Sequence, residues 1–208
     1  MRGFFSLLTA LLLPLPVAAE IQPASQRALQ TCAAPALPFA DRVDQLTALG
    51  WLPLAPDQVE VAALTFAPYD LVLIQGYGAL SAWDIPEAME MLQSTAERNA
   101  DLYARLSVNG ALMALPTGEL IKIELSPSDP LRVSCLSSLA GVTVPEVEAA
   151  ISVTLEDIGH LSIRMFIERS DSPDRPMDVN FLDFAPHAFG EHVPTPLVMI
   201  FSPTSAPE

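Results

Sequence analysis

The chain has 208 residues, half of them hydrophobic, and its 25 acidic residues against 10 basic ones give a formal net charge of −15 at pH 7. A surface with this charge repels phosphate backbones and anionic lipid headgroups, which disfavours nucleic acid and membranes as partners. A cationic partner or a divalent cation would be attracted, although negative charge also simply keeps an exported protein in solution. The length suits a single domain with one buried core.

The first 19 residues have the pattern of a secretory signal peptide. Arg2 provides a positive start, and residues 4–13 form a mostly apolar run. Val17 and Ala19 then place small side chains three and one positions before a cut that leaves Glu20 as the new N-terminus. The apolar run is much shorter than the roughly 20 residues that span a bilayer, so we expect cleavage and no stable membrane association afterwards.

The compartment follows from this leader and from the composition. Arginine outnumbers lysine nine to one, and Ala, Leu and Pro are abundant, a bias typical of a GC-rich bacterial genome. We therefore expect a periplasmic or secreted bacterial protein. Such a compartment is oxidising, so the only two cysteines, Cys32 and Cys135, are expected to form one disulfide. The alternative is that both remain as buried free thiols.

Helices are predicted from hydrophobic periodicity and capping sequences. Residues 20–38 are rich in proline and in small polar residues, which predicts an extended N-terminal arm before a single domain over residues 39–202. A flexible tail is expected over residues 203–208. Within the domain, three amphipathic helices are expected, and they begin near Asp41, at the capping sequence of Asp84 and at that of Thr143.

Strands are predicted where apolar and polar residues alternate. Residues 111–115 and 119–125 have the pattern of a hairpin around Pro116, Thr117 and Gly118, and further strands are expected at residues 131–135, 161–167, 177–184 and 197–201. The unbroken apolar run at residues 70–75 predicts a buried strand. Strands joined by short turns pair antiparallel. The expected fold is therefore α+β, an antiparallel sheet of five or more strands with about three helices on one face, and a mixed sheet is the alternative.

A glycine-containing loop follows the run at residues 70–75. Gly76 and Gly78 lie where a dinucleotide-binding loop would begin, but Ser81 replaces the third glycine of that motif and a separate helix cap intervenes at Asp84. Nucleotide cofactors are also scarce outside the cytoplasm. We interpret the loop as a turn and expect no cofactor.

A candidate metal site lies in a loop near the C-terminus. His187, Glu191 and His192 could bind a transition metal, with His160 or Asp183 as further ligands. The spacing matches neither HExxH nor HxxEH, and no helix is predicted there on which the ligands would converge. Solvated loop side chains are the alternative, and we expect no tight metal binding.

Motifs that identify a hydrolase are missing from the sequence. A GxSxG elbow and an SxxK pair do not occur, and the adjacent acids Glu156 and Asp157, like the pair Asp171 and Asp174, fall in turn-like segments. The sequence favours a non-catalytic binding or accessory domain whose ligand is a protein, a peptide or a small molecule. The alternative is a metal-assisted hydrolase that uses the loop of His187.

Overall fold

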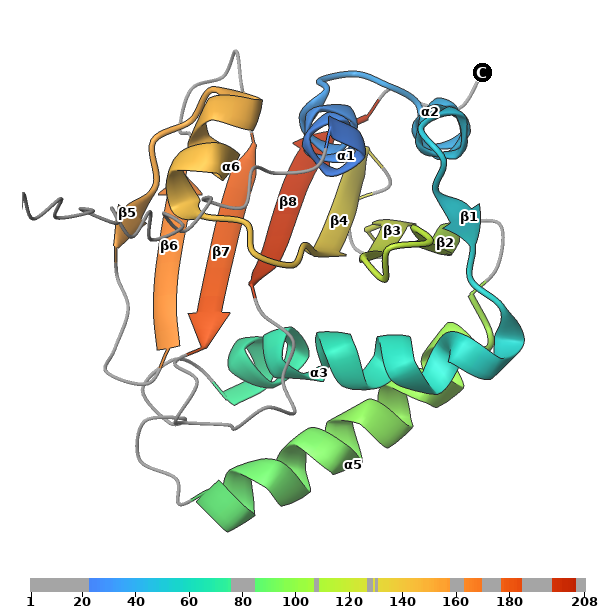
Figure 1. The fold of residues 1–208 in the computed structure, drawn as a ribbon, viewed down its shortest axis with the longest axis vertical. Helices are drawn as coiled ribbons and strands as arrows, with labels where there is room; N and C mark the ends of the chain where they lie inside the picture. The colour runs from blue at the N-terminus through green and yellow to red at the C-terminus, as the bar shows by residue number, and fades with distance from the viewer. Residues whose placement is uncertain are drawn as a thin grey trace, which may run out of the picture.

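The computed structural model describes residues 23–75, 85–106, 109–126, 129, 131–157, 163–169, 177–184 and 196–204. Its helices are α1 (Pro23–Ala33), α2 (Phe39–Ala48), α3 (Val59–Gln75), α5 (Ile85–Tyr103) and α6 (Val144–Ile151), with a 3-10 turn η1 (Pro56–Gln58) (Figure 1). Its strands are β1 (Leu52–Pro53), β2 (Gly110–Ala114), β3 (Leu120–Leu125), β4 (Arg132–Ser138), β5 (Glu156–Asp157), β6 (Ile163–Arg169), β7 (Asp178–Phe184) and β8 (Leu197–Pro203). The predicted α+β class is confirmed.

The strands form one sheet in the order β1-β2-β3-β4-β8-β7-β6-β5. Every pairing between described strands is antiparallel, as expected, so the alternative of a mixed sheet is not found among them. The last strand, β8, lies between β4 and β7, which places it at the centre of the sheet. Its first four residues, Leu197 to Ile200, are all buried, which is typical of a strand covered on both faces.

Helices cover both faces of the sheet, not one face as the sequence suggested. On β4, Val133 and Cys135 belong to a core cluster shared with α1, α2 and α6, whereas Leu136 belongs to a second cluster shared with α3 and α5. Figure 1 shows α1, α2 and α6 gathered on one side and α3 with α5 on the other. The cause is that the central strands direct apolar side chains to both faces of the sheet, so helices must pack on each face to bury them.

Residues 23–33 form helix α1, and the prediction of an extended arm was wrong for them. Ala28, Leu29 and Cys32 on this helix are fully buried. Pro23 stands at the first helical position, where proline is well tolerated, and the next prolines, Pro35 and Pro38, come after the helix has ended. The stretch between them consists largely of good helix formers.

Residues 70–75 belong to α3, and the prediction of a buried strand was wrong. A short apolar run does not distinguish a strand from a helix that is buried nearly all round. Residues 65–72 of helix α3 are of the second kind, because they pack between the sheet and α5 and bury Phe66, Ala67, Tyr69 and Val72 in the second core cluster, whereas Val61 and Leu64 nearer the start of the helix are exposed. No helix in the described part of the chain is long and apolar enough to cross a lipid bilayer.

The other predicted helices and strands are confirmed to within a few residues, but β8 extends to Pro203 and Thr204 is buried, so the prediction of a flexible tail was wrong for these two residues. The hairpin of β2 and β3 turns through Gly118, whose φ of +103° favours glycine. At the start of α6, the amide of Thr143 donates to the Glu146 carboxylate at 2.8 Å and completes the predicted capping box. Helices α2 and α5 lie where their sequence patterns predicted them.

Candidate functional site

A groove of about 1000 Å³ runs between α3 and α5, on the side of the sheet opposite α1 and α6. From α3 it is lined by Glu60, Leu64 and Pro68, which are spaced four residues apart and so share one helix face. From α5 it is lined by eight residues over three turns: Met89, Glu90, Leu92, Gln93, Ala96, Glu97, Ala100 and Asp101. The groove is therefore as long as a short peptide helix.

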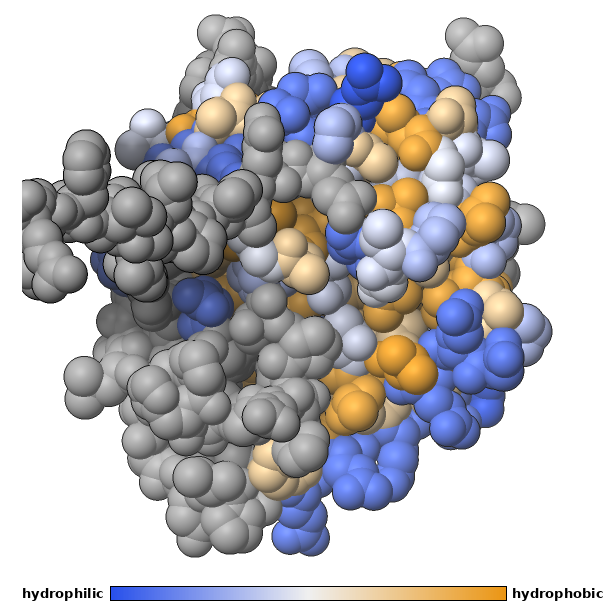
Figure 2. Space-filling view, viewed as in Figure 1, coloured by the Kyte–Doolittle hydropathy of each residue, from blue (hydrophilic) through white to orange (hydrophobic). Residues whose placement is uncertain are grey.

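Apolar side chains on the groove and beside it are unusually exposed. Leu64 in the lining is 46% exposed, and Val61, one turn earlier on α3, is 59% exposed. Opposite them, Ala96 and Ala100 are small and leave room between the helices. In Figure 2, apolar surface lies beside hydrophilic surface over the region of α3 and α5. A groove that exposes apolar side chains among charged ones is a candidate binding surface.

Pro68 is a further feature of the α3 wall. Proline has no backbone N–H, so the carbonyl of Leu64 lacks the donor that an α-helix ordinarily supplies from four residues ahead. Both residues line the groove. Pro68 thus interrupts the main-chain hydrogen bonding of α3 at the wall of the groove.

The groove is acidic. Glu60 lies on the α3 side, while Glu90, Glu97 and Asp101 lie on the α5 side, and the described lining contains no lysine or arginine. Gln93 donates to the Glu97 carboxylate at 3.4 Å and so helps to orient it. These acids are solvent-exposed, and together they give the groove a negative potential.

Beneath the two helices, a buried polar cluster joins α3, α5 and β3. The Asn99 side chain on α5 donates to the Asp70 carboxylate on α3 at 2.6 Å. On β3, the Lys122 ammonium lies 3.1 Å from the Glu124 carboxylate and 5.2 Å from the centre of the Tyr103 ring. None of these five residues lines the groove.

The electrostatics of this cluster follow from its burial. Burial raises the pKa of Asp70 above its ordinary value, and the opposing effects of Lys122 and of the hydrogen bond from Asn99 reduce that rise. Burial, followed by the negative charges of Asp70 and Glu124, raises the pKa of Tyr103. Perturbed groups often mark catalytic sites, but Tyr103 is buried, at 7% exposed, and neither it nor the half-buried Asp70 lines the groove. We interpret the cluster as the polar junction that holds the groove's helices on the sheet.

No protein-family model, no curated protein and no solved structure matches this chain.

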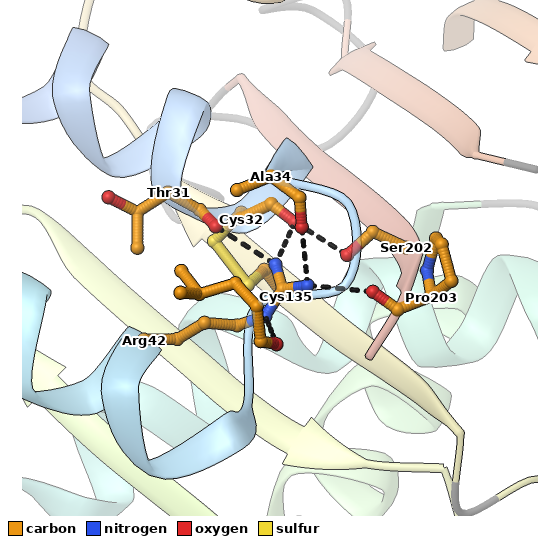
Figure 3. The surroundings of a disulfide bond; sticks show 8 residues. Thr31, Cys32, Ala34, Arg42, Cys135, Ser202 and Pro203 are labelled. Atoms are coloured by element: carbon orange, nitrogen blue, oxygen red, sulfur yellow. Dashed lines mark hydrogen bonds between the residues drawn. A yellow bond between two sulfur atoms is a disulfide. The ribbon is translucent and has the colours of Figure 1, made fainter. Parts of the chain in front are cut away.

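The predicted cysteine pair is brought together on the opposite face of the sheet. Cys32 of α1 and Cys135 of β4 are joined as a disulfide, with Cα atoms 5.9 Å apart, which lies within the range that such bridges require (Figure 3). Both residues are buried in the first core cluster. The bridge fixes α1 to the centre of the sheet.

Arg42 of α2 is fully buried next to this bridge, and sequence reasoning missed it. All five of its N–H groups donate to main-chain carbonyls, on Thr31, Cys32, Ala34, Leu37 and Pro203, at 2.6–3.0 Å (Figure 3). Burial lowers its pKa to about 10, so the guanidinium stays charged at neutral pH. A cation beside the last carbonyls of α1 also complements the helix dipole.

Most of the remaining predicted site residues lie outside the part of the chain that the structure describes. His187, Glu191, His192 and His160 lie outside the described residues, as do residues 76–81 and the acids Asp171 and Asp174. Asp183 is a partly buried residue of β7. Glu156 and Asp157 form the short edge strand β5 and are exposed. Among the described residues, no three His, Cys, Asp or Glu side chains are placed to hold a metal ion.

A smaller recess of about 290 Å³ lies between the C-terminal ends of α1 and α6. It is lined by small and apolar residues with two neutral polar ones: Gln30, Ala33, Ala34, Pro35, Ala150, Ile151, Ser152, Met177 and Pro203. A ligand site ordinarily adds polar groups that converge on one point and fix the orientation of its ligand. The groove between α3 and α5, with four charged side chains, is the stronger candidate.

Proposed function

We propose that this protein is a non-catalytic binding or accessory domain that works outside the cytoplasm and binds a polypeptide partner in the groove between α3 and α5. The observation that carries the proposal is the groove itself, which combines exposed apolar surface at Leu64 with a length of three helical turns on α5. Polypeptides are bound in this manner by helix-in-groove recognition, where apolar anchors fill the hollow and polar groups fix the register.

The rest of the molecule supports a scaffold role. Its ionisable cluster of buried Lys122 and Tyr103 with half-buried Asp70 does not line the groove. A general acid or base must come within hydrogen-bond reach of its substrate. The disulfide and the hydrogen bonds of Arg42 hold α1 firmly on the opposite face of the sheet. The helices of the groove therefore pack against a rigid sheet.

The proposal is tested with a photo-crosslinking amino acid in the living cell. Introduced at position 64, it should capture one partner that is then shown, with purified components, to bind the full chain. The matched control carries the same group at position 131, because Leu131 is also exposed, at 51%, but lies before β4 and away from the groove. Equal capture at both positions, or a captured partner whose binding survives Leu64→Arg, would contradict the proposal.

A further inference from the structure

The acids of the α5 wall follow the periodicity of a helix. Glu90, Glu97 and Asp101 stand at positions i, i+7 and i+11, so they lie on one face and mark out about 16 Å along the helix axis. Glu60 provides a fourth negative charge on the α3 wall. The negative charge is therefore extended along the groove and is not concentrated at one point.

An apolar stripe runs beside this line of charge. Met89, Ala96 and Ala100 have the same spacing of seven and four residues as the acids, shifted by one position. The exposed Leu64 lies on the opposite wall. An occupant that fits both walls needs an apolar face with cations along its edge.

Other classes of occupant fit this arrangement less well. The described acids do not converge on a metal site, so a single divalent cation would not satisfy all of them. Nucleic acid and anionic lipid are repelled by a chain of net charge −15, and a second copy of the chain carries the same charge. A separate polypeptide with basic residues is the complement that remains.

We propose that the groove binds a cationic amphipathic α-helix of a partner protein, with Lys or Arg at positions i, i+7 and i+11 beside its apolar stripe. A third helix that packs along the groove between α3 and α5 has the same rise per residue as α5. Cations spaced along it at i, i+7 and i+11 can therefore each reach one carboxylate of α5. This inference rests on the proposed function and specifies its partner. The charge pairs set register and partner choice, while the apolar stripe provides the buried area.

The test measures binding of three synthetic peptides to the full chain by fluorescence anisotropy. The first is an 18-residue amphipathic helix former with a Leu and Ala stripe and Lys at i, i+7 and i+11, a length chosen to give about five helical turns. The second has Gln in place of each Lys. The third keeps the composition of the first but moves the lysines to the opposite face. We expect the first peptide to bind at least about tenfold more tightly than the other two and to weaken as salt is added.

Matched protein variants test whether the acids of the groove cause the preference for the lysine peptide. The variant Glu90→Gln, Glu97→Gln, Asp101→Asn should weaken binding of the lysine peptide by about tenfold and leave binding of the glutamine peptide unchanged. The control variant Asp44→Asn, Asp57→Asn, Glu156→Gln removes three exposed acids elsewhere and so makes the same change in net charge. It should bind the lysine peptide as the native chain does. Thermal melting confirms that all variants are folded.

The outcomes separate this inference from the proposed function. If the glutamine and lysine peptides bind equally and Leu64→Arg abolishes both, the cationic partner is ruled out and the groove remains the binding site. If the two triple variants weaken binding alike, the effect is one of overall charge and the inference is overturned. If no peptide binds, or if Leu64→Arg changes nothing, both the inference and the proposed function fail.

Discussion

The guanidinium of Arg42 donates to the carbonyl oxygen of Cys32 at 2.6 Å, while the side chain of Cys32 is bonded to Cys135. A covalent bond and a buried charge thus act on the same residue at the C-terminal end of α1. Ser202 of β8 also donates to that carbonyl, at 2.6 Å. The segment that the sequence predicts to be an extended arm is therefore one of the most firmly held parts of the described chain.

Replacing Arg42 with methionine should lower the free energy of unfolding by about 3 to 5 kcal/mol, because five main-chain carbonyls lose their donor in a site closed to water. The free energy of unfolding of Arg42→Lys should lie between those of the native chain and of Arg42→Met, because lysine keeps the positive charge but has fewer donors and no planar guanidinium. Urea denaturation measures both. The control Arg27→Met, on the exposed side of α1, should change stability by less than about 0.5 kcal/mol. If Arg42→Met lowered the free energy of unfolding no more than Arg27→Met does, Arg42 would not have this stabilising role.

Thiol counting under denaturing conditions should find no free thiol in the exported protein before reduction and two after it. The bridge joins residues with a sequence separation of 103. For a loop of this length, chain-entropy estimates give a stabilisation of the folded state of at most roughly 4 to 5 kcal/mol. Reduction should therefore lower the melting temperature markedly. The variant Cys32→Ala, Cys135→Ala is the control, because its melting temperature should not respond to the reductant. Two reactive thiols in unreduced protein would refute the bridge.

Local signals in the sequence predicted the elements that local chemistry determines. The capping box at Thr143, the turn at Gly118 and the periodicity of α5 each depend on neighbours within a few residues, and each was confirmed. Pairing of the two cysteines followed from their number and the expected compartment. The described strands were also located to within a few residues, although which helix covers each face of the sheet was not evident from their sequences.

Features that depend on tertiary packing were missed. Residues 70–75 have the same apolar pattern in a strand as in a helix buried between two layers, and only the packing of α3 against α5 decides between them. The groove could not be predicted while this segment was assigned to a strand. Arg42 occupies an ordinary position in an amphipathic helix, and its acceptors include Pro203, which lies 161 residues away in sequence. No local signal marks such a residue.

Zinc and copper should not bind tightly at His187, Glu191 and His192. The reason is that their spacing matches neither HExxH nor HxxEH, and because they lie outside the described residues this stays a prediction from sequence. Isothermal titration provides the measurement. Sub-micromolar binding that disappears in the variant His187→Ala, His192→Ala would revive the metal-assisted hydrolase as the function.

Export should leave Glu20 as the N-terminal residue. Val17 and Ala19 provide the small side chains that a signal peptidase requires before the cut. Intact-mass analysis of the protein recovered from a bacterial periplasm gives the result directly. A product that retains residues 4–13 would show that the leader is not removed, and Ala19→Arg should block cleavage if the assignment is correct.

Replacing Asp70 with asparagine should stabilise the protein at neutral pH. Burial raises the pKa of Asp70 above its ordinary value of 3.8, so the folded state holds this proton more tightly than the unfolded state. The free energy of unfolding of the native chain therefore falls as pH rises from about the ordinary pKa to the raised one, and stays at the lower level above it. The asparagine side chain is uncharged throughout and can still accept the hydrogen bond from Asn99.

The two proteins should consequently differ least at low pH and most above the raised pKa, in chemical denaturation measured from pH 3 to pH 8. The groups that act on Asp70 are Lys122, Glu124 and Arg98, and they remain in both proteins. Asp57→Asn, at an exposed position, is the control and should produce no such divergence. If Asp70→Asn were instead destabilising at pH 7, attraction to Lys122 would outweigh burial, and the polar junction beneath the groove would depend on an ionised Asp70.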